Sequence, residues 1–88
     1  MIPANFPEAN TRFKAPADLD ESQCSTIPAY VGILQGGNLD GAGVVITAWQ
    51  PSAEERLALA AGETIFLGIM GDGLPPHFLS VGFPGGVA

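Results

Sequence analysis

The stretch Gly43-Val-Val-Ile-Thr-Ala-Trp-Gln-Pro-Ser-Ala-Glu-Glu55 carries the strongest structural signals in the chain. Its first seven residues, 43–49, are rich in β-branched side chains, which favour extended backbone and predict a strand. Pro51 keeps the residue before it, Gln50, out of helical conformation, so the start of the helix is well defined. Ser52 and Glu55 have the spacing of a capping box, in which each side chain bonds the other's backbone amide. The stretch therefore predicts a strand followed directly by a helix.

The predicted helix runs from about Ala53 to Ala61, because Gly62 suits the left-handed position that ends many helices. Roughly nine residues are too few for a helix to be stable alone. One side of it must therefore pack on the rest of the chain. The apolar residues expected on that side are Leu57, Ala60 and Ala61, with Leu59 at its edge.

Further strands are predicted on both sides of this stretch. Residues 28–35 pair with residues 43–49 as a hairpin, across a loop at 36–41 that is rich in glycine. Beyond the helix, residues 63–70 and 77–83 form a second hairpin, since both runs are apolar and a glycine-containing turn separates them. The expected order is ββαββ, an α+β fold with a mostly antiparallel sheet.

The 88 residues predict a single domain with an irregular N-terminal arm. The arm covers residues 1–26, the ββαββ core covers 27–83, and a tail covers 84–88. Three prolines interrupt the arm, and each removes a backbone donor. Its two apolar anchors, Phe6 and Phe13, are expected to hold it across the core.

The pattern of apolar residues predicts a homo-oligomer. Residues 43–49 and 63–70 carry bulky apolar groups on both faces of their strands. One short helix covers part of one face only, so the arm, another subunit or both must cover the other. Large exposed apolar patches are uncommon on monomers, and symmetric self-association is the commonest way to bury them.

The charge balance excludes several classes of partner. The net charge is −6, and the fixed cations are Arg12, Lys14 and Arg56. Nucleic-acid binding requires several cations that displace counterions from phosphates, so no direct DNA or RNA binding is expected. No apolar stretch approaches the roughly 20 residues of a membrane helix. There is no signal-peptide pattern, and the single cysteine, Cys24, excludes an intrachain disulfide.

No motif predicts catalysis, a metal or a cofactor. Asp18, Asp20 and Glu21 lack the alternating ligands and glycine of a calcium loop. Cys24 and His77 are the right residue types for a thiol–imidazole pair, but no strand–turn–helix elbow surrounds Cys24. A small Cys/His-dependent enzyme therefore stays a remote alternative, and the expectation is a protein that is not an enzyme.

Two segments are candidate binding surfaces. Trp49 offers an aromatic contact, although the simpler interpretation is a core anchor beneath the helix start. The run from residue 74 to residue 78 contains two prolines, so it has little entropy to lose on binding; the competing interpretation is a rigid turn. The candidate binding residues are Trp49, Leu74, Pro75, Pro76, His77 and Phe78.

The order and spacing of short motifs resemble a family of small uncharacterised phage and prophage proteins. The resemblance runs along nearly the whole chain. It is carried by Asn5-Phe6, Asn10, Gln23, Ile27-Pro28-Ala29-Tyr30, Asp40-Gly41, Val45-Ile46-Thr47-Ala48-Trp49, Pro51-Ser52, Glu55-Arg56-Leu57, Gly62, Ile65-Phe66-Leu67 and Pro75-Pro76. It implies a phage accessory protein and assigns no catalytic residues.

The expected function is therefore binding, in the host cytoplasm or in a virion. The preferred hypothesis is interference with a host, through a host protein or a small signalling molecule that the protein inhibits or sequesters. The alternative is a structural or decoration protein of the virion.

Overall fold

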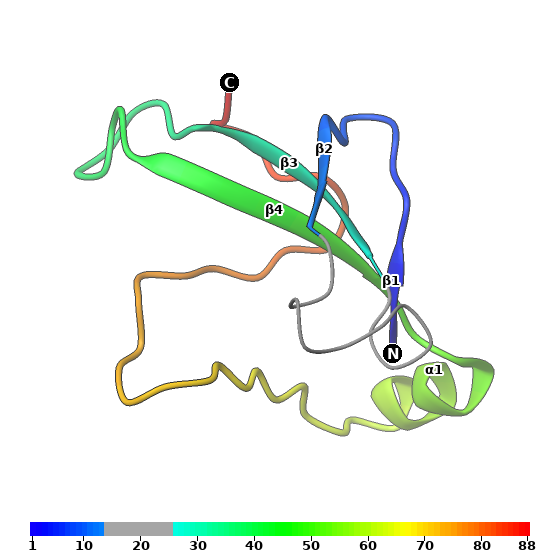
Figure 1. Cartoon of the computed structure of the whole chain (residues 1–88). Coiled ribbons are helices and arrows are strands. Elements are labelled where there is room, and N and C mark those ends of the chain that lie inside the picture. The colour runs from blue at the N-terminus through cyan, green and yellow to red at the C-terminus, as the bar shows by residue number, and fades with distance from the viewer. Residues whose placement is uncertain (14–25) are drawn as a thin grey trace.

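The computed structural model describes residues 1–13 and 26–88, which form one antiparallel sheet and one helix (Figure 1). The strands are β1 (Ile2–Ala4), β2 (Thr11–Phe13), β3 (Ile27–Ile33) and β4 (Gly43–Gln50), and the helix is α1 (Ala53–Ala60). The strand order across the sheet is β1-β4-β3-β2. An α+β fold with four antiparallel strands and a single short helix is thus confirmed for the described residues.

The β3–β4 hairpin forms where the sequence predicts it. Its register pairs Ala29 with Thr47 and Ile33 with Gly43. The glycine-rich loop closes it, because the Gly36 N–H donates to the Asp40 carboxylate at 2.6 Å. Gly36 has a φ of +83°, a left-handed conformation that other residues adopt at a cost.

Helix α1 begins with the predicted capping box. Ser52 Oγ accepts from the Glu55 N–H at 3.1 Å, and Glu55 Oε1 accepts from the Ser52 N–H at 2.8 Å. The helix ends before Gly62, whose φ is +97°. The capping box and the glycine therefore mark the two ends of the helix, as the sequence indicates.

The helix is less buried than predicted, and its half-buried residues, apart from Leu59, are not the expected ones. Leu57 is 73% exposed and Ala60 is exposed, whereas Ala58 and Leu59 are half-buried. Glu55 shares their side of the helix at a spacing of three and four residues, and it pairs with the N-terminal amino group of β1. No residue of α1 is buried, so the expected packing of one apolar side of the helix on the rest of the chain is not found.

The N-terminal arm is more regular than predicted, since it contributes both edge strands. β1 pairs with β4 through Pro3 and Trp49, and β2 pairs with β3 through Arg12 and Pro28. An edge strand tolerates a proline because its missing N–H can face solvent. Residues 14–25 lie outside the described part of the chain, and with them the predictions for Pro16 (the third proline of the arm), for Cys24 and for the acidic group at 18–21.

The strands predicted at 63–70 and 77–83 are absent, so the prediction of a second hairpin is wrong. Figure 1 shows this segment leaving α1, arcing away from the sheet and returning to the end of β3. Among the described residues, no backbone group between residues 64 and 85 has a backbone partner. High β-propensity reflects a fit to a neighbouring strand rather than an intrinsic backbone preference, and here that neighbour is missing.

The core of the described chain is small. Ala29 is its one buried hydrophobic residue. The ring of Phe83 packs edge-on against Tyr30, with centroids 5.6 Å apart, and lies 6.2 Å from Phe6. Phe6 therefore anchors the arm as predicted, while Phe13 remains 47% exposed.

The C-terminal tail is held on the sheet rather than left loose. Ile33 and Ala88 exchange two backbone hydrogen bonds of 2.7 and 2.8 Å, and Leu34 forms a bridge with Val87. None of the described helices is long and apolar enough to cross a membrane.

Candidate functional site: an apolar hollow beside β4

A hollow of about 1900 Å³ lies between β4, one side of α1 and the arc formed by residues 63–84. The strand contributes residues 43–49, and the helix contributes Glu55, Ala58 and Leu59. The arc contributes 63–69 and 75–84, and the rest of the lining comes from the N-terminal segment, the loop between β3 and β4 and Pro51. The hollow exists because the arc leaves α1 without pairing with the strand beside it.

The hollow collects most of the predicted binding residues. Trp49 comes from β4, and Pro75, Pro76, His77 and Phe78 come from the arc. We call these five residues the loop rim. The sixth candidate, Leu74, is 67% exposed and is not part of the lining.

Trp49 lies at the surface of the sheet rather than beneath the helix start. Its side chain is 47% exposed, and its indole N–H donates to Thr47 Oγ1 at 2.9 Å. That bond fixes the ring along the strand while leaving half of its surface accessible. The ring is therefore available for contact.

His77 is fixed within the proline loop by a short-range bond. Its Nδ1 lies 2.9 Å from the Pro75 carbonyl oxygen, which can only accept, so Nδ1 carries the proton in the neutral ring. Nε2 is then an acceptor on a stiff, exposed loop. This arrangement presents one polar atom next to the apolar surface of Phe78, which is 45% exposed.

Glu55 lines the hollow, and its hydrogen bonds shift the pKa of its carboxyl group. The hydrogen bond from the N-terminal amino group lowers the pKa of Glu55 below its ordinary 4.5, and the bond from the Ser52 amide lowers this pKa further. The carboxylate is held at the helix end of the hollow by these bonds. The strand and the facing part of the arc, residues 43–50 and 64–71, contain no charged residue.

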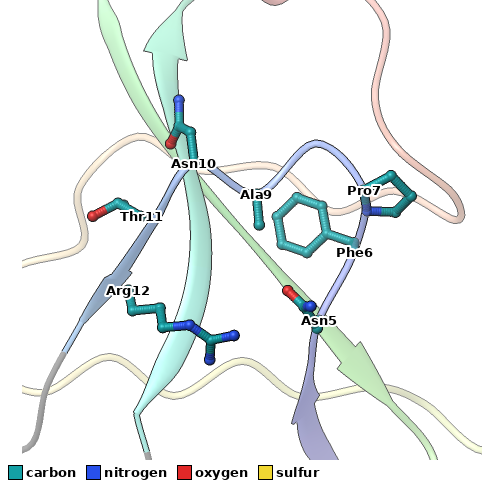
Figure 2. Close-up of a pocket in the computed structure, with 7 residues that line it drawn as sticks. All are labelled: Asn5, Phe6, Pro7, Ala9, Asn10, Thr11 and Arg12. Atoms are coloured by element: carbon teal, nitrogen blue, oxygen red, sulfur yellow. The ribbon is translucent and has the colours of Figure 1, made fainter.

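A second, smaller groove lies at the turn between β1 and β2, and Figure 2 shows its residues. Its volume is about 860 Å³. Asn10 has a structural task there: Oδ1 accepts from the Val31 N–H at 2.9 Å, and Nδ2 donates to the Val31 carbonyl at 3.0 Å. Phe6 packs on Phe83. Sequence reasoning assigned no role to Asn10, and an isolated asparagine ahead of a short strand gives little signal for a backbone clamp.

The remaining chemical candidates are not brought together. In the part of the chain that the structure describes, no three His, Cys, Asp or Glu residues form a group that could hold a metal. Cys24 and the acidic residues 18–21 lie outside that part, so the pairing of Cys24 with His77 stays an untested alternative.

Comparison with known proteins found no matching family model, no similar curated protein and no similar solved structure. The proposal below therefore rests on the site and on the sequence resemblance.

Proposed function

We propose that this protein is a phage-type accessory protein that acts by binding, not by catalysis, and that the loop rim is its contact surface. The observation that carries the proposal is the gathering of Trp49 and residues 75–78 at one apolar hollow. Aromatic side chains near well-packed apolar pockets supply most of the free energy at protein interfaces. A loop with two adjacent prolines adds little ordering cost when it binds.

The size of the hollow favours a protein as the bound partner. Pockets for small molecules measure roughly 300–1,000 Å³, and this hollow has about 1900 Å³. The bound factor is then a host protein, which the accessory protein occupies and inhibits in the host cytoplasm. A small signalling molecule would fill only part of the space.

Affinity capture with the full chain tests this proposal. Wild-type protein is immobilised and exposed in parallel to host lysate and to a protein-free small-molecule extract. We expect one saturable host protein to be retained, and Phe78→Asp to weaken its binding by roughly 30-fold or more, as loss of an interface hot spot does. Leu57→Asp, on the outer face of α1, is the control and should bind normally.

Three outcomes would overturn the proposal. The first is that neither extract yields saturable binding. The second is that Phe78→Asp and Leu57→Asp bind equally well. The third is mass spectrometry of purified phage particles that finds many copies of the chain per particle, which would establish the virion alternative instead.

A further inference from the structure

The chain is too open for a folded protein of its size. Its accessible surface is 6861 Å², whereas a compact protein of 9.0 kDa exposes about 4,900 Å². Its radius of gyration is 14.8 Å, against about 12 Å for a compact chain of this length. The excess surface, about 2,000 Å², is within the range that one subunit buries in an obligate homodimer.

The outer edge of β3 is fully used. Val31 exchanges both of its backbone hydrogen bonds with the Asn10 side chain, and Ile33 exchanges both of its own with Ala88. Both residues therefore turn their N–H and C=O groups away from β4. In an antiparallel pair, when one residue turns its N–H and C=O groups away from the partner strand, the residue directly opposite turns its own N–H and C=O groups away as well.

The corresponding edge of β4 is open. Gly43 stands opposite Ile33 and Val45 stands opposite Val31, so both turn their backbone groups away from β3. β1 covers this side of β4 only from Ala48 onward. Among the described residues, no other segment bonds the backbone of residues 43–47 on this side. We call this stretch the open edge of β4.

A segment suited to the open edge exists in the same sequence. Residues 64–70 read Thr-Ile-Phe-Leu-Gly-Ile-Met, which favours a strand and carries no charge. Their backbone groups have no backbone partner among the described residues. Phe66 is 90% exposed and Met70 is 99% exposed. The segment thus lacks a neighbouring strand for its backbone hydrogen bonds, and its large apolar side chains lack a surface on which to pack.

We propose that residues 64–70 of one copy add as a strand to the open edge of β4 in a second copy, and that the exchange is reciprocal. Strand addition to an open edge supplies backbone hydrogen bonds, with alternate side chains entering the apolar hollow. Chains with a net charge of −6 repel one another, so association needs uncharged surfaces. Both proposed strands meet that condition.

The arc can reach a second copy because only its ends are fixed. The Glu63 N–H donates to the Ala58 carbonyl at 3.0 Å, and the Gly86 carbonyl accepts from the Gln35 N–H at 2.8 Å. The interface uses the open edge and not the loop rim. The open edge and the loop rim border the same hollow, and a dimer carries two loop rims.

Cross-linking of two separately tagged variants tests the pairing. In a Cys24→Ser background, Val45→Cys and Leu67→Cys chains are purified separately, mixed under refolding conditions and treated with a short bis-maleimide. We expect a covalent product that contains one chain of each tag. A Val45→Cys, Leu67→Cys double variant that links only within one chain would overturn the proposal, since the arc would then close on its own β4.

Light scattering at micromolar concentration provides the second measurement. Wild-type protein should have at least twice the mass of one chain. Leu67→Asp should raise the concentration needed for assembly at least tenfold, while Leu57→Asp should leave it unchanged. A monomeric wild type at 100 µM would overturn the proposal even if host capture succeeds, and a dimer that captures nothing overturns only the proposed function.

Discussion

Loss of the Ser52 hydroxyl is the sharpest test of how α1 begins. The Ser52→Ala variant removes the acceptor of the Glu55 amide, a hydrogen bond of 3.1 Å, and leaves that amide without its partner at the first turn. N-cap substitutions of this kind cost typically about 1 kcal/mol of unfolding free energy. The site is exposed, so water replaces part of the lost bond and the cost stays near that value rather than at the upper end of the range.

For a domain of 60–100 residues, 1 kcal/mol corresponds to a fall in Tm of roughly 4–8 °C. Circular dichroism melts give the change in Tm, and urea titrations give the change in unfolding free energy independently. Both must be run at one protein concentration, because the stability of an assembling protein depends on concentration.

Two matched controls separate capping from general damage. Ser52→Asp keeps an acceptor at the same place, so its melt should stay close to that of the wild type. Glu54→Gln and Glu55→Gln make the same charge change; glutamine at residue 55 still offers an acceptor to the Ser52 amide, so their difference reports the ion pair of Glu55 with the N-terminus and not the cap. An unchanged melt for Ser52→Ala, or an equal loss for Ser52→Asp, would refute the capping box as a source of stability.

Three further results are expected. In urea titrations, Gly32→Ala should lower the unfolding free energy by about 1–3 kcal/mol, because a Cβ at residue 32 would lie 2.2 Å from the Ala88 carbonyl oxygen. Gly43→Ala is the control and should be tolerated, because its Cβ would meet open space. Carboxyl NMR titration should give Glu55 a pKa below 4.5, so its contribution to stability is complete above pH 4.5 and is lost as the pH falls through the folded-state value; a value at or above 4.5 would contradict the ion pair. Mobility-shift titrations at physiological salt should show no binding of DNA or RNA, as the net charge of −6 requires; tight binding would mean that cations converge in an assembly.

The local signals in the sequence identified the hairpin and the helix correctly. The β-branched run at 43–49 and the box of Ser52 and Glu55 act over a few residues, so their outcome depends little on the rest of the chain. The apolar residues of both faces also indicated that surface would remain uncovered. Phe66 and Met70 are in fact almost fully exposed.

The errors arose where the outcome depends on distant partners. Residues 63–70 and 77–83 have the composition of strands, but a strand forms only beside another strand. The arm has the prolines of an irregular segment, yet two short stretches of it, β1 and β2, pair as strands with β4 and β3. Helix α1 buries none of its residues and is joined to the N-terminus through Glu55, and periodicity over eight residues carries no information on such a contact.

The sequence indicates which residues form the loop rim, but it does not predict that they lie together. In the sequence, the aromatic surface of Trp49 and the stiffness of residues 75–78 are two separate signals. Their common placement at one hollow follows from the path of the arc, which no local pattern encodes.

The pairing of β1 with β4 has a consequence for synthesis on the ribosome. Ile2 emerges before the rest of the sheet, but its partner, Gln50, lies 48 positions later in the chain. At 5–20 residues per second, β1 waits roughly 2–10 s before the other half of its ladder exists. The β3–β4 hairpin, whose strands are separated by a short loop, closes soon after it is made. Of the four strands in this sheet, the earliest in sequence is thus among the last to find its place.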